Sequence, residues 1–263
     1  MNSRPGIYQN IPNLITLMNV CSGFISIICV FYRNLEYAAL FLIIAAIFDF
    51  FDGFAARILK ATSEKGKVLD SLSDVVSFGA APAAIIFMII QYSLGQAESG
   101  FNFNSTSFTD RLFLFSSVFF LIASSLRLAA FTVQKNTYIF SGMPTPAAAL
   151  LFAGLALIIS DPYENRISEW ILKLHVIIPS LLIISFLMVS KIHFVSFKFR
   201  NFGFRQNIFQ YFLIFISAVL LIFLKKFAIS PIIIIYIIVS FVNHIINKPS
   251  DVWNSLQKLI LCP

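Results

Sequence analysis

Residues 38–59 read AALFLIIAAIFDFFDGFAARIL, an apolar stretch that carries two aspartates and an arginine near its end. A helix of roughly 20 apolar residues crosses the hydrocarbon core of a bilayer, so this stretch is long enough to span a membrane. Each carboxylate at membrane depth costs about 2.5–3.5 kcal/mol on insertion scales unless a partner, water or a ligand compensates it. The stretch therefore predicts a membrane helix whose end contributes to a polar site.

The composition of the whole chain also indicates a membrane protein. Of its 263 residues, 59% are hydrophobic and 12% are charged, and the mean hydropathy is +0.87. Soluble domains carry about 25% charged residues. The formal net charge of +7 is typical of the Lys and Arg excess in cytoplasmic loops of membrane proteins. We therefore expect membrane lipids as neighbours and no nucleic-acid partner.

Eight stretches approach the length of a membrane helix. They are residues 13–32, 38–59, 72–94, 112–133, 145–160, 170–190, 208–224 and 229–246. We expect an all-α integral membrane protein of about eight transmembrane helices. No linker divides the chain, so residues 1–263 are expected to form a single membrane domain.

The loops predict an orientation. The loops 60–67 and 191–206 are basic and fall on the same side as the N-terminus, whereas 95–111 and 161–169 fall on the other side and are acidic. Because Lys and Arg are in excess in cytoplasmic loops, we expect both termini and the site in the cytoplasm. Lys225 and Lys226 are exceptions, since the eight spans place them on the opposite side.

Four aspartates lie at the ends of the second and third spans. Asp49 and Asp52 are three residues apart, and Asp70 and Asp74 are four apart, so each pair shares a helix face. A short connection makes the two helices antiparallel neighbours whose acidic faces can meet. Clustered carboxylates repel one another and favour a hard divalent cation such as Mg²⁺, Mn²⁺ or Ca²⁺. Two such ions can clamp a diphosphate.

Small and basic residues separate the two acid pairs. Gly53 lets a ligand approach the helix backbone, and Ala56 keeps the same face clear one turn later. Arg57 supplies a planar cation suited to phosphate. Close helix packing is the alternative explanation for the two small residues.

Residues 49–74 have the form D-x-x-D-G-x-x-A-R-x8-G-x3-D-x3-D. This pattern resembles the signature of the CDP-alcohol phosphatidyltransferases at every defined position. The resemblance implies helices around a cytoplasm-facing polar cavity, where a CDP-linked donor reacts with an alcohol and releases CMP. It implies that two Mg²⁺ or Mn²⁺ ions are held by Asp49, Asp52, Asp70 and Asp74. Asp74 would also be the catalytic base.

The resemblance also implies contacts to the donor, CDP-diacylglycerol, and a homodimer. The expected donor-binding residues are Gly53, Ala56, Arg57 and Gly66, with Asn13 (in PNLIT, 12–16) and Ser63 as further candidates. The family-like catalytic region covers 13–198. Residues 1–12 would be a cytoplasmic or interfacial segment, and 199–263 would add two spans and a tail.

Several further segments resemble the bacterial and archaeal branch of this family that uses L-serine as acceptor. They are residues 70–83 (DSLSDVVSFGAAPA), 126–129, 142–149 and 189–198. One departure is Ala130, which stands where that branch often has a second arginine. The expected product is phosphatidylserine. Glycerol 3-phosphate or inositol is the alternative acceptor, and a cation transporter is the alternative of another class, against which Arg57 argues.

Arg127 and Ser77 are the candidate acceptor contacts. Arg127 lies late in an apolar span, where an unpaired cation is costly, and we expect it to bind the serine carboxylate or the donor phosphates. A structural salt bridge or snorkelling to the interface is the alternative. Ser77 can hydrogen-bond serine, although a hydroxyl in a membrane helix often bonds its own backbone.

Overall fold

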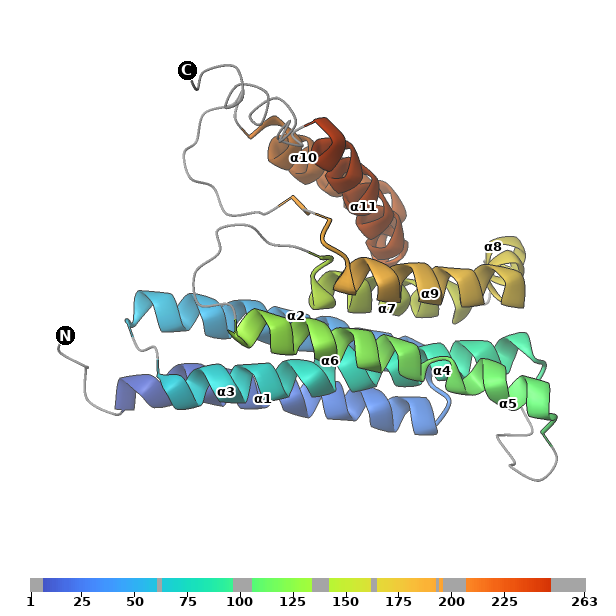
Figure 1. Ribbon diagram of the computed structural model, residues 1–263, viewed down its shortest axis with the longest axis horizontal. Helices are drawn as coiled ribbons and strands as arrows, with labels where there is room; N and C mark the ends of the chain where they lie inside the picture. The colour runs from blue at the N-terminus through green and yellow to red at the C-terminus, as the bar shows by residue number, and fades with distance from the viewer. Residues whose placement is uncertain are drawn as a thin grey trace, which may run out of the picture.

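The computed structural model describes residues 7–60, 63–96, 106–133, 142–161, 165–192, 194–195 and 207–246. Within these ranges every regular element is a helix (Figure 1). In chain order they are α1 (Ile7–Phe31), α2 (Leu35–Ile58), α3 (Glu64–Asp74), η1 (Val75–Ala80), α4 (Ala81–Ser93), α5 (Phe108–Phe115), α6 (Val118–Val133), α7 (Thr145–Ile159), α8 (Asn165–Ile171), α9 (Leu174–Val189), α10 (Ile208–Leu224), η3 (Lys225–Ala228) and α11 (Ile229–Ile246). The expectation of an all-helical fold is confirmed for the described residues.

The helices are long and apolar enough for a membrane protein. Five segments meet the length and hydropathy of a membrane span, and they are Asn10–Phe31, Leu35–Ile58, Glu64–Ser93, Phe108–Ala130 and Ile208–Ile245. The last of these contains both α10 and α11, joined by the turn η3. Helices α7 and α9 are apolar but shorter. Helix covers most of each of the eight predicted stretches, although turns at 116–117 and 172–173 interrupt the stretches 112–133 and 170–190. The number of helices that cross the bilayer stays a prediction.

The first two helices form an antiparallel pair (Figure 1). A short connection joins them, and the side chain of Asn34 caps α2 by accepting a hydrogen bond from the Tyr37 amide at 3.1 Å. Such a cap satisfies an amide that would otherwise lack a partner at the helix start. Along the pair, the Ser26 hydroxyl donates to the Ala38 carbonyl at 2.7 Å, which sets the register between α1 and α2.

The third span begins earlier than its apolar pattern predicts. The helix starts at Glu64 rather than residue 72 and continues through α3, η1 and α4 to Ser93. The Ser63 side chain caps it by accepting a hydrogen bond from the Gly66 amide at 3.0 Å. The first turns are polar, so hydropathy alone misses them. Asp70 consequently lies inside a helix, and the π-helix η1 begins directly after Asp74.

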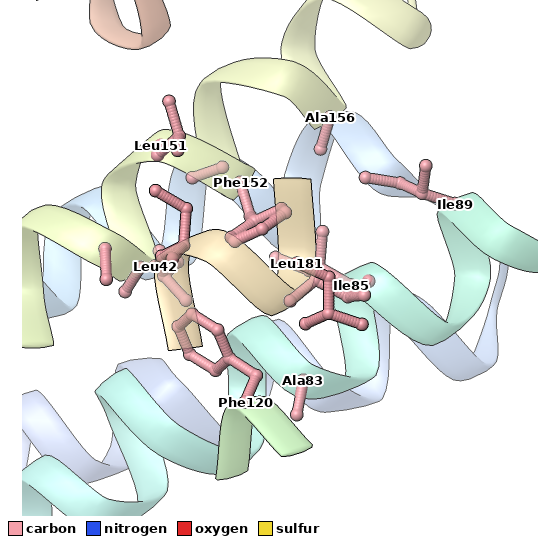
Figure 2. Close-up of a cluster of buried hydrophobic side chains, with 14 of the residues drawn as sticks. Leu42, Ala83, Ile85, Ile89, Phe120, Leu151, Phe152, Ala156 and Leu181 are labelled. Atoms are coloured by element: carbon pink, nitrogen blue, oxygen red, sulfur yellow. The ribbon is translucent and has the colours of Figure 1, made fainter. Parts of the chain in front are cut away.

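A buried apolar cluster holds the central helices together. Figure 2 shows Leu42 of α2, Ile85 of α4, Phe120 of α6, Phe152 of α7 and Leu181 of α9 gathered in it. The rings of Phe120 and Phe152 pack edge to face with centroids 5.5 Å apart. The core therefore fixes α2 and the third span relative to α6 and α7, and these elements carry the polar residues described next.

Helix α11 packs against α7. The Ser230 hydroxyl of α11 donates to the Leu151 carbonyl of α7 at 2.8 Å. A Cβ on Gly154 would lie 2.6 Å from the Ser230 amide nitrogen, so the glycine permits this close approach. Figure 1 shows α10 and α11 as a hairpin inclined to the other helices.

Candidate active site

The two acidic helix faces meet as their spacing predicts. Asp49 lies in the last turns of α2, and Asp70 and Asp74 lie in α3. One carboxylate oxygen from each of these three residues lies within 4.8 Å of the others. Like charges at such distances repel one another, so this group of three carboxylates suits a bound cation.

Asp52 lies beside this group rather than in it. Its side chain is buried, with Oδ2 lacking a hydrogen-bond partner, and it lines a pocket with Asp70. Oδ1 of Asp74 is also buried without a partner. Carboxylate oxygens without protein donors are the ligands that hard divalent cations prefer. The four residues therefore fit the predicted divalent metal site, with Asp52 at its edge.

An open pocket adjoins the carboxylates and contains most of the predicted donor-binding residues. Three elements build it, namely the start of α1, the end of α2 and the capped start of α3. Its lining residues are Pro12, Asn13, Thr16, Asp52, Gly53, Ala56, Ser63, Gly66, Lys67 and Asp70. Arg57 is not among them. Its Nε donates to the Gly53 carbonyl at 2.8 Å and its side chain is exposed.

The two glycines of the pocket have different surroundings. A Cβ on Gly66 would lie 3.0 Å from both Asn13 Oδ1 and Ser63 Oγ, so close packing explains that glycine. A Cβ on Gly53 would meet no described atom within 4 Å. Packing against the described residues therefore does not explain Gly53, and this face of α2 is open.

The two candidate acceptor residues lie on different helices, η1 and α6. Ser77 is fully buried in η1, and its hydroxyl donates to the Asn19 carbonyl of α1 at 3.1 Å rather than to its own helix. Arg127 of α6 has a buried Nε without a hydrogen-bond partner. Its guanidinium lies within electrostatic range of Asp74 and of Tyr236. The fold thus brings the predicted cation toward the carboxylates.

The sequence motifs did not indicate Tyr236 or Asn19. Tyr236 is a buried residue of α11, and its hydroxyl donates to the Val195 carbonyl at 3.1 Å. Its helix lies outside the motif-bearing region, so no spacing indicated it. Asn19 is a polar residue in an apolar helix, which is a signal that sequence alone could have supplied.

Two of the segments that resemble the serine-using branch lie against each other. The Gly142 amide donates to the Ile192 carbonyl at 2.9 Å, and the Met143 amide donates to the Leu187 carbonyl at 3.0 Å. Gly142 has a φ of +84°, a conformation that glycine adopts without strain. These segments therefore form one structural junction between the start of α7 and the end of α9.

Comparison with known proteins identifies the family. Residues 9–184 match the family model described as CDP-alcohol phosphatidyltransferase. The chain is 34% identical over 194 residues to the CDP-diacylglycerol–serine O-phosphatidyltransferase of Bacillus subtilis (strain 168), covering 72% of this chain and 91% of that protein. It is 31% identical over 193 residues to the protein of the same name from Helicobacter pylori (strain 26695), covering 71% and 72%.

An archaeal relative shows the same likeness. The chain is 33% identical over 157 residues to the CDP-diacylglycerol–serine O-phosphatidyltransferase of Methanocaldococcus jannaschii, covering 60% of this chain and 65% of that protein. The residues that the family model matches, 9–184, include the aspartate cluster and its pocket. Membership of an enzyme family argues against the cation-transporter hypothesis. This chain belongs to the CDP-alcohol phosphatidyltransferase family and is a membrane-embedded transferase.

Proposed function

We propose that this protein transfers the phosphatidyl group of CDP-diacylglycerol to the hydroxyl of L-serine, giving phosphatidylserine and CMP. The observation that carries the proposal is the convergence of the Asp49, Asp70 and Asp74 carboxylates beside a pocket with an open glycine face. The names of the bacterial and archaeal relatives support serine as the acceptor.

The pocket would bind the CDP part of the donor. The open face of Gly53 leaves room for a diphosphate to approach α2. Arg57 and Lys67 bring cations to the exposed end of α2 and to the pocket wall, and guanidinium and ammonium groups both suit phosphate. Asn13 and Ser63 add polar groups at the same end. The lipid chains of the donor would then lie along the apolar helix surfaces.

The aspartates would hold two divalent ions, Mg²⁺ or Mn²⁺. When bound, such ions supply positive charge that neutralises the diphosphate and the departing CMP. Asp74 would be the base, because its buried Oδ1 has no hydrogen-bond partner and can accept the proton of the acceptor hydroxyl. The serine oxygen then bonds to the lipid-side phosphorus as the bond from that phosphorus to the CMP oxygen breaks.

Arg127 would bind the acceptor. Its guanidinium lies within electrostatic range of Asp74, so a serine whose hydroxyl faces Asp74 can turn its carboxylate toward this cation. A phosphorylated acceptor such as glycerol 3-phosphate would need several cations around the same point, and α6 supplies one. Inositol, which is uncharged, would leave the arginine without a partner.

We further propose a cell-membrane location with the site and both termini in the cytoplasm. The pocket lies beside Lys65 and Lys67, and Lys and Arg are enriched in cytoplasmic loops. A homodimer is proposed on the resemblance to the family.

The test is CMP release from CDP-diacylglycerol by the detergent-purified full chain. Serine, glycerol 3-phosphate and inositol are offered separately with Mg²⁺ or Mn²⁺, and product lipids are identified by mass spectrometry. We expect phosphatidylserine with serine alone, and loss of CMP release when a chelator removes the metal. Turnover with another acceptor would refute the assignment of serine. Absence of metal-dependent CMP release from folded protein would refute the proposed reaction.

A further inference from the structure

Asn19 of α1 is a fully buried polar side chain without a hydrogen-bond partner. Neither its Oδ1 nor its Nδ2 is paired with any described residue. Leaving a buried polar group unpaired costs about 1–3 kcal/mol, and little water reaches the interior of a membrane span to compensate it. The amide therefore destabilises the fold as it stands, which is typical of a residue kept for a ligand.

Hydrogen bonds between helices place Asn19 about one helical turn deeper than Asp74. The Ser73 hydroxyl donates to the Thr16 carbonyl at 3.1 Å, and the Ser77 hydroxyl donates to the Asn19 carbonyl at 3.1 Å. Asp74 lies between Ser73 and Ser77 in the chain. Asn19 is therefore level with the turn of the third span that begins at Asp74.

The register of α2 leads to the same placement. The bond from the Ser26 hydroxyl to the Ala38 carbonyl aligns the two antiparallel helices. Seven residues toward the start of α1, this alignment sets Asn19 opposite Ala45, one turn before Asp49. Asn19 thus lies beside the inner edge of the cluster on both of its neighbouring helices.

The site is open toward Thr16 and closed beyond Asn19. Thr16, which lies one turn before Asn19 in α1, lines the pocket. One turn deeper, a Cβ on Gly23 would lie 2.7 Å from the Ser77 Cα. Helices α1 and η1 therefore touch directly at Gly23, one turn deeper than Asn19. Between the two, the Ser22 hydroxyl is already paired with the Met18 carbonyl at 2.8 Å, so Asn19 is the unpaired polar side chain nearest to this contact.

We infer that Asn19 contacts the acceptor at the inner end of the site. A side-chain amide offers an acceptor oxygen and two N–H donors. This combination matches the ammonium and carboxylate groups of an amino-acid zwitterion. The phosphate of an acceptor such as glycerol 3-phosphate accepts hydrogen bonds and donates few. It would therefore leave the amide oxygen of Asn19 facing an anion without a donor. The inference rests on the proposed function, because it concerns the acceptor of the same reaction.

The test is Asn19→Leu, which replaces the amide by an apolar side chain of similar size. We expect the KM for serine to rise by about tenfold or more, as for the loss of one or two hydrogen bonds to a charged group. The KM for CDP-diacylglycerol should change by less than about twofold by the same reasoning. The melting temperature should stay the same or rise, because an unpaired buried amide has been removed.

Ser26→Ala is the matched control on the same helix. Its hydroxyl is fully buried and hydrogen-bonded to α2, so its loss should lower the melting temperature without changing the KM for serine. A melting temperature lowered in Asn19→Leu with an unchanged KM for serine would overturn the inference, since the amide would then serve the fold. Unchanged behaviour in both measurements would overturn it as well.

Different experimental results would refute the inference about Asn19 and the proposed function. An active wild type that makes phosphatidylserine, together with an unchanged KM in Asn19→Leu, refutes the role of Asn19 alone. A wild type that uses glycerol 3-phosphate in place of serine refutes both, because the amide was assigned to an amino acid. Calorimetric binding of L-serine to the protein loaded with CMP and Mg²⁺ gives a second readout, and Asn19→Leu should weaken it by the same factor.

Discussion

Lys226 and Asp161 form an ion pair, with 3.2 Å between the ammonium nitrogen and a carboxylate oxygen. The same ammonium lies 3.1 Å from a carboxylate oxygen of Glu36. Glu36 lies in the first turn of α2, Asp161 follows α7, and Lys226 lies in η3 between α10 and α11. These three chain segments therefore meet at one end of the bundle. Lys226 was an exception to the loop-charge pattern, and its acidic neighbours offer a local electrostatic reason for its position.

This pairing predicts the result of a topology measurement. Single cysteines at the exposed positions Lys225 and Lys65, in a chain whose own cysteines are replaced, should lie on opposite sides of the membrane. We expect a membrane-impermeant maleimide to label Lys225→Cys in intact cells and Lys65→Cys only after permeabilisation. The reverse pattern would invert the proposed orientation, and labelling of both in intact cells would contradict the arrangement of the spans.

The aspartate cluster predicts loss of turnover without loss of folding. Asp70→Asn and Asp74→Asn should each lower kcat by about a thousandfold or more, because a metal ligand is lost in both and the base is lost in Asp74→Asn. Both variants should elute from size-exclusion chromatography as the wild type does. Asp110→Asn in α5 is the matched control and should keep normal activity. Near-native turnover in either cluster variant would contradict the assigned roles.

The surroundings of Gly53 and Gly154 predict different effects of the same substitution. Gly154→Ala should destabilise the protein by about 1–3 kcal/mol, because the new methyl group overlaps α11. Gly53→Ala should not lower the melting temperature, since no described atom lies near it and alanine is the better helix former. It should raise the KM for CDP-diacylglycerol by about tenfold if the donor approaches that face. If Gly53→Ala is destabilised and its KM for CDP-diacylglycerol is normal, the role of Gly53 is helix packing and not donor binding.

The position of Arg127 predicts that its substitution will change the KM for serine and not the KM for the donor. Arg127→Ala should raise the KM for serine by about tenfold or more, because the loss of a charge-assisted hydrogen bond costs about 1.5–3 kcal/mol. Arg127→Lys should recover only part of the affinity, since an ammonium cannot bind a carboxylate in the bidentate way of a guanidinium. A rise in the donor KM instead would assign Arg127 to the phosphates, and no change in either constant would refute both roles.

Part of the site could be predicted because helix periodicity acts over short distances. The three- and four-residue spacings put Asp49 with Asp52 and Asp70 with Asp74, and the short connection made the two pairs neighbours. The meeting of Asp49, Asp70 and Asp74 followed from that spacing and is confirmed. The start of the third span did not follow, because Ser63 caps a polar first turn that hydropathy does not detect.

The amino-acid sequence by itself determined the membrane class, the helical periodicity and the motif from Asp49 to Asp74, because each depends on hydropathy or on residues close in the chain. Only the tertiary structure decided that Gly53 is open while Gly66 is packed, that Tyr236 of α11 lies near Arg127, and that Asn19 is buried beside the cluster without a partner. These relationships join residues far apart in the chain. They depend on the register and packing of several helices, which local patterns do not specify.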